Sequence, residues 1–158
     1  MTDLSVHFSS ASPTWDTPIE FFNKINQEFN FTLDPACMEN SAKCSKYYTP
    51  ETDGLSASWA GETVWLNPPY GRVISDWIEK AYNEAKNPNT IVSMLLPART
   101  DTKWFHDYCI QGEVRLIKGR LKFTNVDNEI STTAPFPSML VVFGGSYWGK
   151  PMTTISNN

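Results

Sequence analysis

The stretch from residue 63 to residue 70 constrains the fold more than any other part of the chain. Residues 63–66 (TVWL) are β-branched and aromatic, which predicts a buried strand, and Asn67-Pro68-Pro69-Tyr70 follows at once. A proline disfavours the helical conformation in the residue before it and has no amide hydrogen. The strand is therefore expected to end in a stiff loop of hydrogen-bond acceptors, at the edge where open α/β sheets bind their ligands.

This loop can receive a planar amine. The side-chain oxygen of Asn67 and the main-chain oxygen of Pro68 can converge on one amine, while the ring of Tyr70 stacks on the same substrate. An aromatic amine is a poor nucleophile because its lone pair is delocalised, and two acceptors would free that lone pair to attack an electrophilic methyl group. The alternative is an ordinary turn, since Asn-Pro pairs commonly begin turns. The buried strand in front of the loop favours the chemical interpretation.

Composition limits the classes of protein to which the chain can belong. Its 158 residues are the length of one domain, and a hydrophobic content of 41% is typical of a globular protein. The net charge of -4 argues against a general nucleic-acid coat protein, because such binding needs many Lys and Arg on one surface. Any contact with DNA is therefore expected to be local.

The cysteines and the apolar stretches indicate an intracellular protein. The chain has only three cysteines, Cys37, Cys44 and Cys109, and an odd number this small does not indicate a disulfide framework. Cys37 and Cys44 also lack the spacing of a zinc site. No stretch is apolar for long enough to cross a membrane, and the polar start is unlike a signal peptide. We therefore expect a cytoplasmic protein with reduced thiols, no metal and no membrane partner.

Strand and helix patterns alternate along the chain. Thr17 is expected to cap a helix that begins at Pro18, with Glu20 completing a capping box, and Asp101 is expected to cap a later helix. The remaining patterns predict a helix at 73–85 and strands at 31–33, 46–48, 63–66, 91–96, 113–118 (continuing through 119–123) and 139–143. This alternation is typical of an α/β three-layer sandwich.

The expected organisation is a single compact domain. Residues 1–14 are predicted to form a flexible arm, 15–145 the domain and 146–158 a polar tail. The loop at 124–138 is a candidate for reading bases or closing over a site, or a long connection.

Six motifs in order resemble those of the small phage-type DNA N6-adenine methyltransferases, the Dam family. The resemblance runs from about Trp15 to Phe143 and depends on the order of the motifs more than on any single one. The motifs are Trp15-Asp16-Thr17-Pro18-Ile19-Glu20-Phe21-Phe22, Leu33-Asp34-Pro35-Ala36, Asp53-Gly54-Leu55, Asn67-Pro68-Pro69-Tyr70, Leu96-Pro97-Ala98-Arg99-Thr100-Asp101 and Gly119-Arg120-Leu121-Lys122-Phe123.

The resemblance implies a Rossmann-like enzyme that uses S-adenosylmethionine to methylate a flipped adenine in double-stranded DNA, with GATC as the site that the family name suggests. Such an enzyme would act in the host cytoplasm if phage-encoded. The implied catalytic residues are Asn67, Pro68, Pro69 and Tyr70. The implied cofactor residues are Trp15, Thr17, Pro18, Asp34, Ala36, Asp53 and Leu55.

Three basic residues, Arg99, Arg120 and Lys122, are candidates for phosphate contacts, with solvated surface charge as the alternative. One departure from the family pattern is the turn at 34–40, which contains no glycine where a glycine-rich cofactor turn is expected. Asp53-Gly54 can likewise be an ordinary turn.

Two other functions remain open. Similar loops occur in methyltransferases that modify RNA or a protein glutamine, because a glutamine amide or another base amine presents a similar planar nitrogen. A chain without the glycine-rich turn can also be a DNA-binding relic that no longer binds the cofactor.

Overall fold

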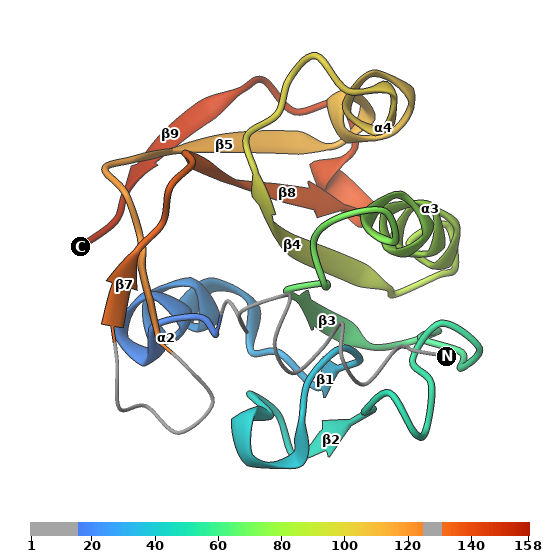
Figure 1. The fold of residues 1–158 in the computed structure, drawn as a ribbon. Helices are drawn as coiled ribbons and strands as arrows, with labels where there is room; N and C mark the ends of the chain where they lie inside the picture. The colour runs from blue at the N-terminus through green and yellow to red at the C-terminus, as the bar shows by residue number, and fades with distance from the viewer. Residues whose placement is uncertain (1–15, 125–130) are drawn as a thin grey trace.

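The computed structural model describes residues 16–124 and 131–158, which are built around a seven-stranded mixed sheet (Figure 1). Strand β8 runs antiparallel to both of its neighbours, β4 and β5, and the other neighbouring strands pair in parallel. The strands lie in the order β2 (Lys46–Tyr47), β1 (Leu33–Asp34), β3 (Thr63–Leu66), β4 (Ile91–Pro97), β8 (Ser138–Phe143), β5 (Glu113–Lys118) and β9 (Thr153–Ser156).

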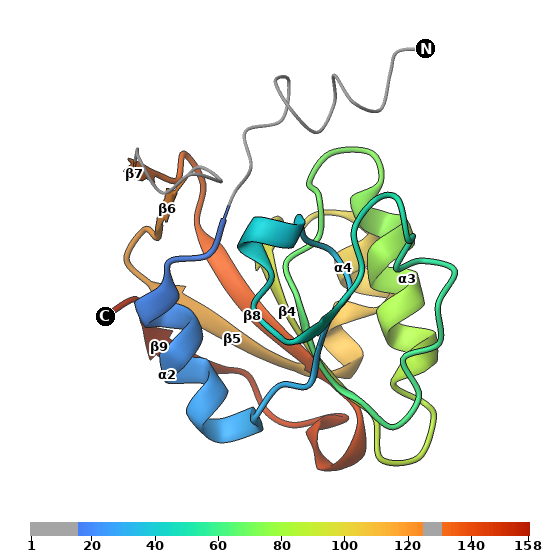
Figure 2. The same ribbon diagram turned by 90° about the horizontal axis from the view of Figure 1, so that it is seen from below.

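Helices cover both faces of this sheet. Helix α2 (Ile19–Phe29) lies on one face, while α3 (Ile74–Glu84) and α4 (Lys103–Asp107) lie on the other (Figure 2). Three short 3-10 helices, η2 (Glu39–Ser41), η3 (Cys109–Gln111) and η4 (Gly145–Tyr147), join these elements. The α/β three-layer sandwich expected from the sequence is confirmed, and it is consistent with a Rossmann-like methyltransferase fold.

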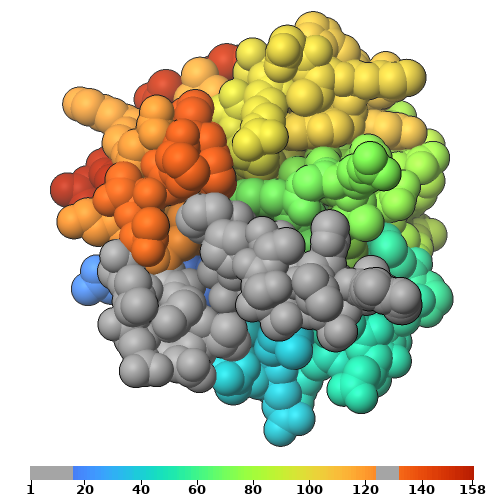
Figure 3. Space-filling view, in the orientation of Figure 1, coloured from blue at the N-terminus to red at the C-terminus, as the bar shows by residue number. Residues whose placement is uncertain are grey.

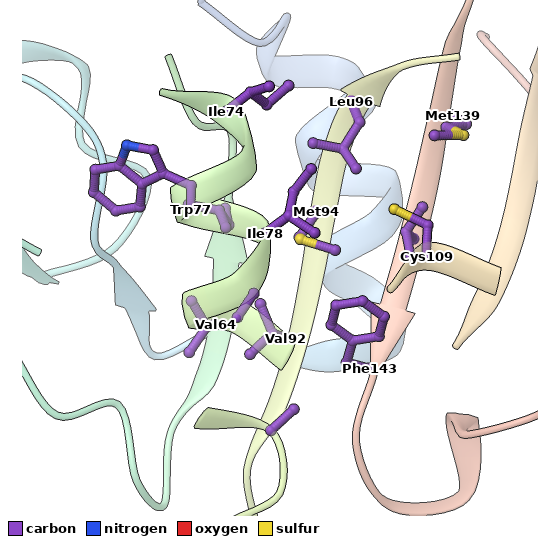
Figure 4. Close-up of a cluster of buried hydrophobic side chains, with 14 of the residues drawn as sticks. Val64, Ile74, Trp77, Ile78, Val92, Met94, Leu96, Cys109, Met139 and Phe143 are labelled. Atoms are coloured by element: carbon purple, nitrogen blue, oxygen red, sulfur yellow. The ribbon is translucent and has the colours of Figure 1, made fainter. Parts of the chain in front are cut away.

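The alternation of side chains along the strands divides the core into two halves. In β3, Val64 and Leu66 belong to the cluster under α3, whereas Trp65 belongs to the cluster under α2. Figure 4 shows the first cluster, in which Ile78 of α3 lies close to Met94 of β4. Strands β3, β4 and β8 are apolar on both faces and buried on both sides, as their continuous hydrophobic runs predicted.

The caps of two helices differ from the sequence prediction. Helix α2 begins at Ile19 after Pro18 and has no side-chain cap, so the predicted cap by Thr17 is wrong. Thr17 instead accepts a hydrogen bond from Asn67. Helix α4 is capped by Thr102, whose Oγ1 accepts from the Phe105 amide at 3.2 Å, and not by Asp101.

The region after β5 also differs. Residues 119–123 do not extend β5, because the chain turns at Gly119, which has a φ of 88°. A separate strand, β6 (Lys122–Thr124), pairs antiparallel with β7 (Ser131–Thr133) inside the segment expected to be a loop. The rest of that segment, residues 125–130, lies outside the described residues, as does the predicted arm at 1–14.

The C-terminal segment, expected to be a polar tail, adds strand β9 to the sheet. It pairs in parallel with β5, and Lys24 Nζ of α2 donates to the backbone oxygens of Ser156 at 3.0 Å and Asn158 at 2.9 Å. None of the helices within the described residues has the length and apolar character needed to cross a membrane.

Candidate active site

Segments distant in the sequence meet at one edge of the sheet. Strands β1, β3 and β4 are parallel neighbours, so their carboxyl ends lie side by side. These ends deliver Pro35, Asn67 and Ala98 to the same region. Open α/β sheets bind their ligands at this edge, and the motifs singled out in the sequence converge there.

A cavity of about 550 Å³ lies at this edge. Its lining includes most of the residues that the sequence analysis assigned to the cofactor or to catalysis: Thr17, Asp34, Ala36, Asp53, Leu55, Asn67, Pro68, Pro69 and Tyr70. Pro18 is not among the lining residues and instead precedes helix α2. Trp15 lies outside the described residues.

The side chain of Asn67 is oriented by a buried threonine. Asn67 Nδ2 donates a hydrogen bond to Thr17 Oγ1 at 3.0 Å, and Thr17 is only 3% exposed. With its nitrogen bound to Thr17, the amide of Asn67 is held in one orientation. The segment before α2 therefore positions the first residue of the Asn67-Pro68-Pro69-Tyr70 loop.

The ring of Tyr70 is held at both ends. Its hydroxyl donates to the backbone oxygen of Leu95 in β4 at 3.2 Å, and its ring meets Phe136 edge-on with centroids 5.6 Å apart. Burial raises the pKa of the Tyr70 hydroxyl, although the nearby Arg99 acts in the opposite direction. The hydroxyl is therefore a neutral donor, and its role here is to anchor the ring. Phe136 comes from the segment that the sequence suggested as a closing loop.

Asp34 ends β1 and ties down the turn that follows. Its carboxylate accepts from the backbone amides of Lys43 at 2.9 Å and Ala36 at 3.4 Å. The residue is 2% exposed, and this burial raises the pKa of its carboxyl to about 6. Asp34 therefore holds in place the segment from Ala36 to Lys43, which forms part of the cavity wall.

The facing wall is the loop at 53–55. Asp53 has a left-handed backbone with φ 58°, and its Oδ1 accepts from the Leu55 amide at 3.2 Å, as in the ordinary turn considered from the sequence. A Cβ on Gly54 would lie 2.0 Å from the backbone oxygen of Pro35. Only a glycine at position 54 therefore lets this loop pack against the turn after β1, which itself contains no glycine.

Charge in the cavity is predominantly negative. Among the described lining residues, Lys43 carries a positive charge. Four others carry carboxylates: Asp16, Asp34, Glu51 and Asp53. Asp16 and Lys43 form an ion pair at 3.3 Å, and burial raises the pKa of Asp16. The sequence analysis did not single out Asp16, Lys43 or Glu51 as site residues, because no local pattern marks a charge that the fold alone brings in. This lining suits a ligand with net positive charge.

The three predicted phosphate contacts have different surroundings. Arg99 is exposed at the end of β4, and its guanidinium carbon is 5.8 Å from the centroid of the Phe136 ring. Arg120 Nη1 donates to the backbone oxygen of Ala134 at 3.1 Å, and Lys122 is exposed on β6. Of the three, Arg99 is the one near Tyr70. Within 16–124 and 131–158, no three potential ligands among His, Cys, Asp and Glu form a metal site.

Comparisons with known proteins agree with this geometry. The DNA N-6-adenine-methyltransferase of Haemophilus phage HP1 is 34% identical over 140 residues, which span 85% of this chain and 80% of the phage protein. The DNA N-6-adenine-methyltransferase of Escherichia phage T1 is 38% identical over 93 residues, which span 58% of this chain and 38% of that protein. A sequence profile of one family matches residues 6–158. The chain therefore belongs to the DNA N-6-adenine-methyltransferase (Dam) family.

Proposed function

We propose that this protein transfers a methyl group from S-adenosylmethionine to the exocyclic N6 of adenine in double-stranded DNA. One observation carries the proposal: in a chain of the Dam family, Asn67-Pro68-Pro69-Tyr70 lines the same cavity as Asp34 and Asp53. Amine acceptors and a negatively charged ligand site thus share one space, which is what methyl transfer to an amine requires.

The cavity fits the proposed methyl donor in size and charge. Its volume of about 550 Å³ lies in the range of sites for ligands of this size. S-adenosylmethionine has a sulfonium, an ammonium and a carboxylate, so its net positive charge matches the excess of carboxylates in the lining. Asp34, Ala36, Asp53 and Leu55 would hold it. When bound, it supplies an electrophilic methyl group on a sulfur that leaves as a neutral thioether.

The Asn67-Pro68-Pro69-Tyr70 loop would act on the adenine amine. Asn67 Oδ1 and the Pro68 carbonyl accept the two amine hydrogens, which draws the nitrogen towards tetrahedral geometry. The nitrogen lone pair would then be free to bond to the methyl carbon that the bound cofactor supplies, and the proton that the nitrogen gives up would pass to solvent water. The Tyr70 ring stacks on the base, and its bond to Leu95 keeps that ring in place.

The target base would have to leave the duplex to reach this loop. We propose that residues 15–145 perform both catalysis and binding of DNA, in the cytoplasm of the host cell, and we take GATC as the first sequence to test. Sequencing the methylated adenines in DNA from cells that express the protein identifies the recognised site.

A methylation assay tests the proposal. Purified protein with methyl-labelled S-adenosylmethionine and unmethylated DNA is expected to place label on adenine N6, and Asn67→Ala is expected to lose activity by at least about 100-fold. RNA and protein extract serve as competing acceptors. Preferential labelling of RNA or of protein glutamine would establish one of the alternative methyltransferase functions instead.

Calorimetry with S-adenosylmethionine tests the remaining alternative, a DNA-binding relic. We expect micromolar binding with a stoichiometry of one, because the cavity and its carboxylates are present. DNA binding in the absence of any heat of cofactor binding would support the relic.

A further inference from the structure

A second cavity, of about 340 Å³, adjoins the first. Tyr70 lines both cavities, so the two meet at this residue. The second cavity is lined by the segment that follows Tyr70 and by the loop between β4 and α4; its principal side chains are Tyr70, Arg72, Pro97, Arg99, Thr102 and Trp104. Figure 3 shows these two segments, green and yellow, side by side on one face of the molecule.

The charge of the second cavity is opposite to that of the first. Arg72 and Arg99 are both exposed, and none of the described residues that line this cavity is acidic. Within the described part of the chain, no carboxylate forms an ion pair with either guanidinium. Two exposed arginines beside the reactive loop, with no carboxylate partner among the described residues and in a chain with a net charge of -4, indicate a local site for an anion.

The loop that carries Arg99 is held in a fixed conformation. The Ala98 amide donates to the Pro137 oxygen at 2.8 Å. Thr102 Oγ1 donates to the Arg99 oxygen at 2.8 Å while it caps α4. Only the side chain of Arg99 is therefore free to move, which lowers the entropic cost of binding a ligand. Trp104 adds a half-buried aromatic wall to the same cavity.

We infer that the second cavity binds the sugar–phosphate backbone of the target strand, with Arg72 and Arg99 contacting phosphates next to the adenine that enters the site. This inference depends on the proposed function and names the part of the protein that holds its substrate. A phosphodiester fits because its charge matches the arginines, Trp104 offers an apolar surface to the sugar, and Tyr70 joins this cavity to the amine-binding loop. The sequence analysis named Arg99 but not Arg72 or Trp104.

Binding of a fluorescent DNA duplex, measured by anisotropy at several salt concentrations, tests the inference. Arg72→Ala and Arg99→Ala are each expected to weaken binding by about three- to tenfold and to reduce the slope of log affinity against log salt by about 0.9. Affinity for S-adenosylmethionine, measured by calorimetry, is expected to stay within about twofold of the parent protein, because neither arginine lines the first cavity.

Lys86→Ala is the matched control. Lys86 follows the opposite end of α3 from Arg72, and its ammonium lies 4.3 Å from the centroid of the Tyr82 ring. Both Lys86→Ala and Arg72→Ala remove one positive charge. A difference in DNA affinity between them is therefore due to the position of the charge and not to the net charge of the protein. Should either alanine variant fail to fold, Arg72→Gln and Arg99→Gln remove the charge with a smaller change in shape.

The outcomes separate this inference from the proposed function. If Arg72→Ala and Arg99→Ala bind DNA as Lys86→Ala does, or if the parent protein does not bind the duplex, the second cavity is not the phosphate site. If the arginine variants lose affinity and salt dependence while the parent protein transfers no methyl group to DNA, the inference stands and the proposed function fails.

Discussion

At the scale of single residues, Thr17 illustrates how the fold gives a side chain a task that the sequence did not predict. Its hydroxyl accepts from Asn67 Nδ2 at 3.0 Å and is not needed as a helix cap. Thr17→Val keeps the shape but removes the acceptor. The loss of one hydrogen bond of about 1 kcal/mol is expected to lower kcat roughly fivefold, because Asn67 loses its fixed orientation.

Thr17→Ser is the control, since it retains the hydroxyl and is expected to stay within about twofold of the parent kcat. Methylation rates at saturating DNA and cofactor give the comparison. A Val variant that raises only the KM for the cofactor, with kcat unchanged, would assign Thr17 to cofactor binding instead.

Asp34 gives the protein a predictable dependence of stability on pH. Its folded-state pKa of about 6 lies above the ordinary value of 3.8, so the folded protein holds the proton more tightly than the unfolded chain. This contribution to the free energy of unfolding is fully present below about pH 4 and is lost as the pH rises through about 6, by roughly 3 kcal/mol. Asp34→Asn lacks this titration.

Urea denaturation of the parent protein and Asp34→Asn at intervals between about pH 4 and pH 7 measures the effect. The stability of the parent relative to the variant is expected to fall by roughly 2 kcal/mol across this range. Because all other groups titrate in both proteins, a constant difference would show that Asp34 does not titrate as expected.

At the scale of elements, Arg115 joins β5 to α2. Its guanidinium nitrogens donate to both carboxylate oxygens of Glu28 at 2.8 Å and also to Glu113 Oε1 at 2.8 and 3.0 Å. Arg115→Met is expected to destabilise the protein by about 3 kcal/mol, because it leaves the buried carboxylate of Glu113 without its partner. Denaturant unfolding measures the loss.

Glu28→Gln provides the contrast within the same cluster. The Glu28 side chain is 42% exposed, and a glutamine can keep one hydrogen bond to Arg115, so a loss of about 1 kcal/mol is expected. Equal losses for the two variants would mean that burial of Glu113 does not determine the energetics of the cluster.

The elements also show what the sequence could and could not predict. Strands β3, β4 and β8 were predictable because their apolar runs are long enough to reveal burial, and β5 was predictable from its alternation of polar and apolar residues. Strand β9 was not, because Thr153–Ser156 is short and largely exposed, and its pairing with β5 joins distant segments. Ala36 and the Asn67-Pro68-Pro69-Tyr70 loop line the cavity and follow strand ends, which the sequence could predict. The ion pair of Asp16 and Lys43 depends on tertiary contacts that no local pattern marks.

At the scale of the whole molecule, an acidic cavity and a basic one meet at Tyr70. The net charge of -4 is therefore unevenly distributed: the first cavity suits a cation and the second a polyanion. Sequence composition could predict that contact with DNA would be local, but not where it would lie. The position became evident once the fold brought Arg72 and Arg99 to the same cavity.

This distribution of charge predicts different salt responses for the two ligands. We expect two phosphate contacts from Arg72 and Arg99, and up to four if Arg120 and Lys122 also take part. This number of contacts gives a slope of log affinity against log salt of about -2 to -4. DNA affinity is therefore expected to fall roughly 15- to 250-fold between about 50 and 200 mM salt. Cofactor affinity, measured by calorimetry, is expected to change by less than about threefold, because the ligand carries only one net positive charge whereas DNA is a polyanion. A slope near zero for DNA affinity would show that the proposed phosphate contacts do not form. A slope near -8 would require a basic surface far wider than this cavity.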